Sequence, residues 1–171
     1  SLNEWCEVNK KDTIEFFNSP IADFNIPKIC ENDSFSIINM STSIDSLIDY
    51  RFILDNRDTV KIPDANFEGL PNGTYSLRLK VIHNKSFADS IQKVFEVFSK
   101  PEVGFTILNN NTGIPFSVDL DNRTTNAISY IWDFGNGDTS HLRIPEFTYS
   151  DTGTYRLNLI ATSIEGCTDS A

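Results

Sequence analysis

The stretch Tyr130-Ile-Trp-Asp-Phe-Gly-Asn-Gly-Asp138 decides the fold, because the chain contains a second, weaker copy of its surroundings. When Tyr50 is aligned with Tyr130, 12 of the 41 positions in residues 50–90 are identical to those in residues 130–170. The segment Gly153-Thr-Tyr155 returns as Gly73-Thr-Tyr75. A fixed period of this length indicates tandem modules of roughly 80 residues.

Upstream of this match the alignment shifts by one position. Pro20 then aligns with Pro101, Phe24 with Phe105, and Phe35-Ser36 with Phe116-Ser117; further upstream Cys6 aligns with Phe87, Glu15 with Glu96 and Phe17 with Phe98. We expect residues 1–19 to be the last strand of a preceding module or a linker. Residues 20–100 should form a first, degenerate module, and residues 101–171 a second module that lacks its final strand.

Short strands separated by turn residues dominate both modules. Apolar and polar residues alternate, or β-branched and aromatic residues cluster, in segments such as 35–38, 50–54, 75–81 and 129–134. Turn clusters rich in Gly, Asn, Asp and Pro lie between them. No segment keeps a helical period. The pattern predicts an all-β chain of β-sandwich modules.

The motif itself has structural explanations. Tyr130, Trp132 and Phe134 should share one strand face, with Trp132 as the buried anchor between sheets. We expect Asp133 to brace the following turn, Gly135 and Gly137 to take positive φ, and Asp138 to close the turn through a side-chain to backbone bond. Gly153-Thr-Tyr155 is typical of a tyrosine corner.

These residues carry a family resemblance. The motif, followed by Pro145-Glu-Phe-Thr-Tyr149 and Gly153-Thr-Tyr155, resembles a PKD domain (polycystic kidney disease repeat), which implies tandem immunoglobulin-like β-sandwiches. Asn136 stands where the family usually has Asp, and Phe147 where His is common. The residues matched to the motif are Tyr130, Trp132, Asp133, Phe134, Gly135, Gly137, Asp138, Tyr149, Gly153 and Tyr155.

The ending Glu165-Gly-Cys-Thr-Asp-Ser170 resembles PKD-like repeats of Bacteroidota surface proteins, notably gliding-motility adhesins exported by type IX secretion. Five Asp-Ser/Thr-aliphatic sites resemble the O-glycosylation acceptor motif of that group; turns at strand edges are the alternative. The candidate acceptors are Thr13, Ser46, Thr59, Ser90 and Ser170.

The composition limits the partners. A formal net charge of −10 argues against nucleic acid and against adsorption on anionic membranes, and no apolar run is long enough for a membrane span. The three cysteines, Cys6, Cys30 and Cys167, form no zinc-like pattern. Within its own module, Cys30 would have its partner at the position of Phe87, and Cys167 would have its partner near Asn111. Neither position holds a cysteine. We therefore expect unpaired thiols or partners outside this sequence, with a Cys6–Cys30 bridge as the alternative.

No arrangement of residues favours catalysis. Asp133 and Asp138 lie on a motif whose turn geometry explains both, and no phosphate-binding loop is present. Calcium is the most specific site hypothesis, since Asp119, Asp121 and Asn122 offer oxygen ligands in one loop and some PKD domains bind Ca²⁺. A solvated loop is the alternative. No other cofactor is expected. Exposed aromatic residues could also form a sugar-binding surface.

The leading hypothesis is a non-catalytic spacer in a long, secreted cell-surface adhesin used for gliding or attachment. Its partners would be neighbouring modules, the secretion machinery during export, and surface glycans or proteins. Prolines in Ser19-Pro20 and Lys100-Pro101 would stiffen the junctions. The alternative is a pair of accessory modules in a secreted glycoside hydrolase or protease. A further hypothesis is that residues 7–18 add a strand to the open edge of module two in a neighbouring copy.

Overall fold

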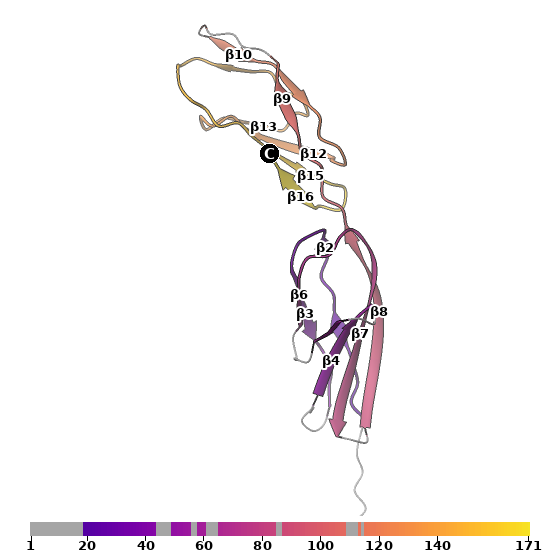
Figure 1. Cartoon of the computed structure of the whole chain (residues 1–171). Coiled ribbons are helices and arrows are strands. Elements are labelled where there is room, and N and C mark those ends of the chain that lie inside the picture. The colour runs from indigo at the N-terminus through magenta and orange to yellow at the C-terminus, as the bar shows by residue number, and fades with distance from the viewer. Residues whose placement is uncertain are drawn as a thin grey trace, which may run out of the picture.

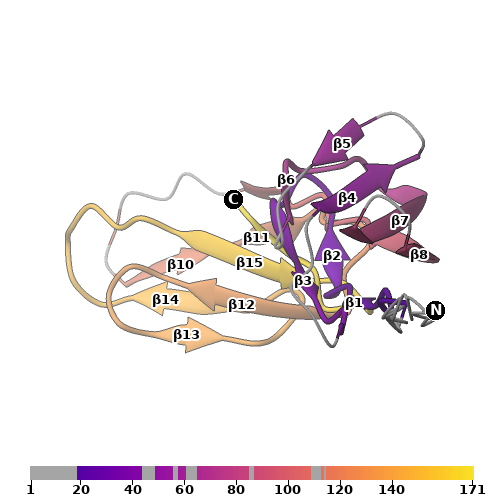
Figure 2. The ribbon, with the colours of Figure 1, turned by 90° about the horizontal axis from the view of Figure 1, so that it is seen from below.

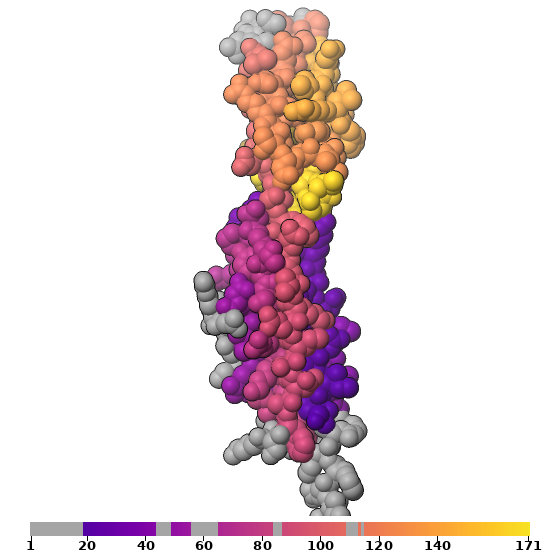
Figure 3. All heavy atoms as spheres, turned by 90° about the vertical axis from the view of Figure 1, so that its right-hand side faces the viewer, coloured from indigo at the N-terminus to yellow at the C-terminus, as the bar shows by residue number. Residues whose placement is uncertain are grey.

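The computed structural model describes residues 19–43, 49–55, 58–60, 65–84, 87–108, 113 and 115–171. Within these residues the regular secondary structure is all β-strand. The molecule is elongated, with one module stacked on the other and a narrow waist between them (Figure 1, Figure 3). Seen from below, the strands of the second module extend to one side of the first, so the two modules are inclined to each other (Figure 2).

The first module is a sandwich of two sheets. A five-stranded sheet has the order β2-β8-β7-β4-β5, and a three-stranded sheet has the order β1-β3-β6. The bounds are β1 Phe24–Asn25, β2 Ile29–Cys30, β3 Phe35–Asn39, β4 Asp49–Leu54, β5 Asp58–Val60, β6 Ala65–Phe67, β7 Gly73–Asn84 and β8 Phe87–Phe98. All pairings are antiparallel except that of β2 with β8.

The second module repeats this plan with shorter strands. One sheet has the order β13-β12-β15-β16, and the facing layer consists of the pairs β9-β11 and β10-β14. The bounds are β9 Phe105–Ile107, β10 Phe116–Val118, β11 Leu120–Asn122, β12 Ser129–Asp133, β13 Thr139–Ser140, β14 Phe147–Tyr149, β15 Asn158–Thr162 and β16 Thr168–Ser170. The prediction of tandem immunoglobulin-like β-sandwich modules is confirmed.

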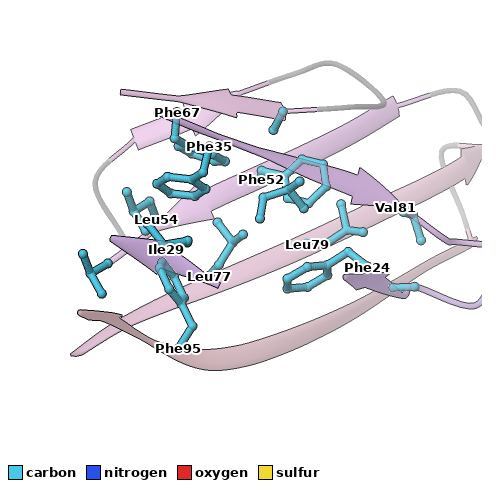
Figure 4. Close-up of a cluster of buried hydrophobic side chains, with 14 residues drawn as sticks. Phe24, Ile29, Phe35, Phe52, Leu54, Phe67, Leu77, Leu79, Val81 and Phe95 are labelled. Carbon is cyan, nitrogen blue, oxygen red and sulfur yellow. The ribbon is translucent and has the colours of Figure 1, made fainter. Parts of the chain in front are cut away.

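Each module has its own core, built from the inward positions of alternating strands. In the first, Phe24, Phe52, Leu77 and Leu79 are fully buried between the sheets (Figure 4). In the second, Trp132 takes the place of Phe52: Phe52 pairs with Leu79, and Trp132 pairs with Leu159, the counterpart of Leu79 in the repeat. The repeat in sequence is thus a repeat of packing.

One pair of strands departs from the sequence alignment. Phe35 of β3 pairs with Phe67, and in the second module the counterpart of Phe67, which is Phe147, pairs with Val118. Phe35 therefore corresponds to Val118, and the alignment of Phe35-Ser36 with Phe116-Ser117 was wrong. The loop before this strand is two residues longer in the second module. A shift of two residues keeps the same side chains facing the core, which is why the error was invisible in the hydrophobic pattern.

In the second module, β16 takes the place that β8 has in the first. Asp169 of β16 pairs with Ala161, as Asp89 of β8 pairs with Val81 in the first module. The described chain thus includes three residues of the strand that the sequence analysis expected to be missing. Residues 1–18 lie outside the described residues.

Candidate functional site: the junction between the modules

A disulfide crosses the junction between the two modules. Cys30 at the end of β2 is bonded to Cys167 in the turn before β16, with 5.7 Å between their Cα atoms and a sequence separation of 137. Cys30 pairs with Phe98, the last residue of β8, and the Cys167 Sγ lies 3.9 Å from the Phe98 carbonyl oxygen. The bond therefore joins the end of one sandwich to the beginning of the next.

The expectation for the cysteines was wrong. Partners were expected within one module, where the equivalent positions hold Phe87 and Asn111. The structure stacks the modules end to end, so that β2 of the first module meets the turn between β15 and β16 of the second (Figure 1). Cys6, the cysteine considered as an alternative partner for Cys30, lies outside the described residues.

The turn that carries Cys167 is closed by its own hydrogen bonds. The Ser163 backbone N–H donates to the Cys167 carbonyl at 2.8 Å, and the Gly166 N–H donates to the Ser163 carbonyl at 2.9 Å. The buried Ser163 hydroxyl also accepts from the Cys167 N–H at 3.2 Å. Gly166 has φ +83, a conformation that suits glycine. These bonds fix the position of Cys167 towards the first module.

The linker between the modules is held on both sides. On the first-module side, the Lys100 backbone N–H donates to the Glu31 carboxylate at 2.8 Å, and its ammonium group pairs with Asp33. On the second-module side, the Asn126 side-chain amide donates to the Ser99 hydroxyl at 3.0 Å and to the Lys100 carbonyl at 3.2 Å. The linker is thus anchored to the folded parts it connects.

Lys28 adds a contact at the same place. Its ammonium group lies 5.4 Å from the centre of the Phe98 ring, a cation–π arrangement. A Cβ at Gly166 of the second module would lie 3.7 Å from the same ammonium nitrogen. The disulfide, the linker contacts and Lys28 thus all lie at the junction of the two modules.

The Trp132 motif has a packing role. Trp132 is fully buried, its indole N–H donates to the Leu142 carbonyl at 3.0 Å, and its ring meets Phe105 edge-on with 5.0 Å between centres. Phe134 is buried beside it and Tyr130 is half-buried, while Ile131 and Asp133 face outwards. The prediction that the three aromatic residues share one face is confirmed.

The glycine turn after the motif is held by short-range hydrogen bonds. The Asp133 carboxylate accepts from the Gly135 N–H at 2.9 Å, and both Gly135 and Gly137 have positive φ, as expected. The Asp138 carboxylate differs from the prediction, because it accepts from the Asn136 side-chain amide at 2.8 Å and not from backbone. The Asn136 side-chain oxygen instead accepts from the Asp138 N–H at 3.1 Å.

At the position equivalent to Gly135, the first module has a positive φ without glycine. Asp55 occupies the place of Gly135 with φ +45, a region that Asp tolerates better than most residues. Its carboxylate accepts from the Ser76 N–H at 2.8 Å. Both modules therefore have a positive φ at this position.

Both modules contain the tyrosine corner. The Tyr75 hydroxyl donates to the Pro71 carbonyl at 2.9 Å, and the Tyr155 hydroxyl donates to the Asp151 carbonyl at 3.1 Å. Gly153 lies against the Tyr155 ring. Nearby, the Tyr149 hydroxyl donates to the Phe134 carbonyl at 2.7 Å, and burial, followed by the nearby Tyr155 and Asp133, raises the Tyr149 pKa.

The candidate calcium ligands are not brought together. Asn122 is buried, donates to the Arg143 carbonyl at 2.7 Å and accepts from the Thr124 N–H at 3.0 Å. Asp121 faces the opposite side of β11 and pairs with Arg123 at 2.7 Å, while Asp119 is exposed. The side-chain oxygens thus point to different sides of the strand. Within the described residues no cluster of three His, Cys, Asp or Glu side chains is placed to hold a metal.

The candidate glycosylation sites are distributed along the chain. Ser90 in β8 and Ser170 in β16 are exposed, and the backbone of Thr59 lies in β5. Thr13 and Ser46 lie outside the described residues. The Asp89 carboxylate next to Ser90 accepts from the Ala22 N–H at 2.8 Å, so this Asp contributes to the fold. Glycosylation stays a prediction.

The second module matches a known family. Residues 100–171 match the family model described as PKD domain. The pre-pro-metalloprotease PrtV of Vibrio cholerae serotype O1, in strains M66-2 and ATCC 39315 / El Tor Inaba N16961, is 38% identical over 66 residues. This alignment covers 39% of the present chain and 6% of PrtV, so the chain spans only a small part of this relative. The second module is thus similar to PKD domains.

Solved structures show similarity over one or both modules. The PKD1 domain of Vibrio anguillarum Epp is 20% identical, with a TM-score of 0.45, and the match covers 49% of this chain and 99% of that one. A structure from a study of carbohydrate-binding modules of the β-sandwich superfamily gives 16% identity and a TM-score of 0.46, over 87% of this chain and 56% of that one. The fibronectin(III)-like modules of Clostridium thermocellum CbhA are 13% identical, with a TM-score of 0.47. This match covers 88% of this chain and 91% of that one.

No described segment forms a helix long and apolar enough to cross a membrane.

Proposed function

We propose that the two modules act as a stiff, non-catalytic spacer in an extracellular protein. The observation that carries this proposal is the disulfide between Cys30 and Cys167, supported by the linker contacts of Lys100 and Asn126. Two sandwiches joined by a free linker would reorient independently. A covalent bond beside an anchored linker removes most of that freedom, which suits a part that holds other domains at a fixed distance.

The disulfide also supports an extracellular location. Structural disulfides persist in oxidising compartments and are rare where thiols are kept reduced. The excess of acidic residues, giving a formal net charge of −10, suits a soluble, extended molecule that repels its neighbours.

The bridge changes how the spacer responds to tension. Pulled between its ends, the oxidised chain carries force through Cys30 and Cys167 and bypasses the residues between them. The residues between the two cysteines, which form most of both sandwiches, are then shielded from extension. Tandem modules without a bridge would unfold in repeated steps of equal length. With the bridge intact those steps should be absent, and they should appear on reduction.

The spacer is proposed to belong to a long surface adhesin for attachment or gliding, such as those exported by type IX secretion in Bacteroidota. The support is the resemblance of the Glu165–Ser170 ending together with the tandem period. Surface glycans or proteins would then be bound by other parts of the same protein. Exposed Ser90 and Ser170 would be available for O-glycosylation.

The second candidate is an accessory module pair in a protease, and the alignment with the metalloprotease PrtV favours it. The two candidates share the stiff spacer and differ in what it connects. Sequence on both sides of these residues decides between them: further repeats with the same period support the adhesin, and a catalytic domain supports the accessory role.

Residual dipolar couplings test the spacer itself. In weakly aligned samples of the oxidised chain, both modules should report one common alignment tensor, because they move as one body. In a Cys30→Ser/Cys167→Ser variant the two tensors should diverge. Different tensors in the oxidised chain would rule out a stiff spacer under either candidate.

A further inference from the structure

Three basic side chains lie on the outer face of the five-stranded sheet in the first module, where β4 and β7 lie side by side (Figure 1). Arg51 of β4 pairs with Lys80 of β7, and Arg78 lies two residues before Lys80 on the same side of the sheet. Phe52 and Leu79, which alternate with them along the strands, are fully buried, so the three cations point away from the core. Arg78 and Lys80 are exposed and Arg51 is half-buried. We call these three residues the basic face.

The positive charge of the basic face is only partly balanced. The Arg51 guanidinium forms an ion pair with Asp49 of its own strand at 2.8 Å. Arg78 donates from Nε at 3.2 Å and from Nη2 at 2.7 Å to the side-chain oxygen of Gln92, which is neutral. In the part of the chain that the structure describes, neither Arg78 nor Lys80 forms an ion pair with a carboxylate. The face therefore has an excess of positive charge, although the formal net charge of the chain is −10.

The fold does not require positive charge at these positions. In the second module the counterparts of the basic face are Ile131, Ile160 and Asn158, and none of them is charged. Like charges directly opposite each other on neighbouring strands destabilise a sheet, so Arg51 and Lys80 carry a cost that the isoleucine pair avoids. A costly feature that one module has and the other lacks indicates a role outside the fold.

Basic residues are also concentrated in the module that carries this face. Residues 20–100 contain nine Lys and Arg with eleven Asp and Glu, whereas residues 101–171 contain three with nine. A polyanion would be repelled most strongly by the second module and attracted at the basic face. The charge distribution thus favours the first module as the place where an anionic partner binds.

Uncharged hydrogen-bonding groups lie beside the cations on β8. Ser90 pairs with Lys80. Gln92, two residues further along β8, pairs with Arg78, and both β8 residues are exposed. The side-chain oxygen of Gln92 accepts from Arg78, which leaves its amide nitrogen as a donor for a ligand. The set of cations, hydroxyl and amide matches a ligand that carries both carboxylates and hydroxyl groups.

Aromatic rings are absent from this side of the sheet. The outward positions of β4, of residues 74–82 and of residues 88–96 hold none. A neutral sugar chain, whose rings pack against aromatic side chains, would therefore find little to bind. Charge has to supply most of the affinity of this face for a partner.

We propose that the basic face binds a linear acidic polysaccharide. The carboxylates of its sugar units would pair with Arg78 and Lys80, whose Cα atoms are about 7 Å apart along β7. Arg51 lies opposite Lys80 and extends the positive surface onto β4. Hydroxyl groups of the sugars would bond to Ser90 and Gln92. The first module would then hold such a chain against its own side, a role beyond that of keeping other domains apart.

A narrow polymer fits this face better than a nucleic acid or an anionic membrane. Three cations on two strands neutralise only a few phosphates, while the acidic remainder of the chain would repel a duplex, which carries one charge about every 1.7 Å. A membrane surface would extend past the face and meet those same acidic residues. A sugar chain can lie along the cations alone.

Isothermal titration calorimetry of the whole chain with soluble polygalacturonate tests the proposal. At low ionic strength this polymer should bind, and the affinity should fall as NaCl is added, because salt screens exposed charges. Galactan, a neutral polymer of galactose, should give no heat beyond that of dilution. An absence of binding to polygalacturonate, or equal binding to galactan, would overturn the proposal.

Two double variants separate the basic face from the net charge of the chain. Arg78→Gln/Lys80→Gln should lower the affinity for polygalacturonate by about tenfold or more, since it removes two charge-assisted contacts. Arg143→Gln/Arg156→Gln removes the same number of charges from exposed positions of the second module and should leave the affinity nearly unchanged. Circular dichroism confirms that both variants are folded. An equal loss of affinity in the two variants, or a larger loss in the second, would contradict binding at this face.

Amide chemical shifts then locate the contact. On addition of polygalacturonate, the amides of residues 51–53, 78–80 and 90–92 should shift. The Cys30→Ser/Cys167→Ser variant should show the same shifts, because the basic face lies within one module, so this proposal and the stiff spacer can fail separately. Shifts concentrated elsewhere would overturn the proposal, and so would tighter binding to duplex DNA or to phosphatidylserine vesicles than to polygalacturonate.

Discussion

Cys30 and Cys167 have a sequence separation of 137 with their Cα atoms 5.7 Å apart, so that one covalent bond encloses nearly all of both modules. This bond at the junction distinguishes the chain from two sandwiches that are joined by a flexible linker alone. Its properties lead to most of the expected behaviour below.

Removing the disulfide should lower the free energy of unfolding. In the chain-entropy model a loop of this length contributes about 5 kcal/mol, and measured values often fall below the model. The Cys30→Ser/Cys167→Ser variant should therefore unfold at clearly lower urea concentration, followed by circular dichroism. Cys6→Ser is the matched control and should not change the midpoint; an unchanged midpoint in the double variant would show that the bridge does not constrain the unfolded chain.

Trp132 should contribute to the stability of the second module and Phe52 to that of the first. Each is fully buried at the equivalent position, and truncation of such a residue to Ala costs about 3–5 kcal/mol. Trp132→Phe should cost less, about 2 kcal/mol, because it keeps most of the packing and leaves the Leu142 carbonyl without its donor. Urea unfolding measures the loss of free energy of unfolding in Trp132→Ala, Phe52→Ala and Trp132→Phe. A Trp132→Ala variant as stable as the wild type would contradict the packing role of the motif.

The two glycines of the turn should respond differently to alanine. Both have positive φ, but a Cβ on Gly135 would lie 2.6 Å from the Arg156 carbonyl oxygen, whereas a Cβ on Gly137 meets open space. Gly137→Ala should cost about 1 kcal/mol from backbone conformation alone. Gly135→Ala should cost more, about 3 kcal/mol, because backbone must also move. Equal losses of thermal stability in the two variants would argue against the close approach of Arg156.

Tyr149 should make the second module sensitive to alkaline pH. Burial raises its pKa above the usual value of 10.0, so the folded chain holds this proton more tightly than the unfolded chain. The stabilisation is complete below pH 10 and should be lost as the pH rises through the higher, folded-state pKa. Urea midpoints measured across this range should fall more steeply for the wild type than for Tyr149→Phe. Parallel pH profiles would mean that Tyr149 ionises as easily in the folded state.

Much of the fold could be predicted from the sequence, because packing against the core requires apolar residues at regular positions. The motif around Trp132 and the tyrosine corner at Gly153–Tyr155 each have a counterpart in the first module, and alternation revealed most strands. The register of β10 and β11 could not be predicted: an identical Phe-Ser pair suggested the wrong alignment, and a shift of two residues preserves the inward face.

The junction escaped sequence reasoning for a different reason. Cys30 and Cys167 occupy non-equivalent positions in successive modules, and the repeat offers no sign that these positions meet. A signal was nevertheless present, since Cys30 is followed within three residues by two acidic residues, Glu31 and Asp33, that bind Lys100 of the linker. Asn122 shows the converse: the loop suggested a metal ligand, and the structure uses both ends of its amide for backbone contacts.

Single-molecule pulling between the two ends of the chain tests most directly whether the disulfide joins the two modules into one spacer. In the oxidised chain only the residues outside the bridge can extend, and their full length is about 11 nm. After reduction, two further steps of about 24 nm each should appear, one for each module, adding about 47 nm for the 137 residues that the bridge had enclosed. Module-sized steps in the oxidised chain, at the same forces as in the reduced one, would contradict the account.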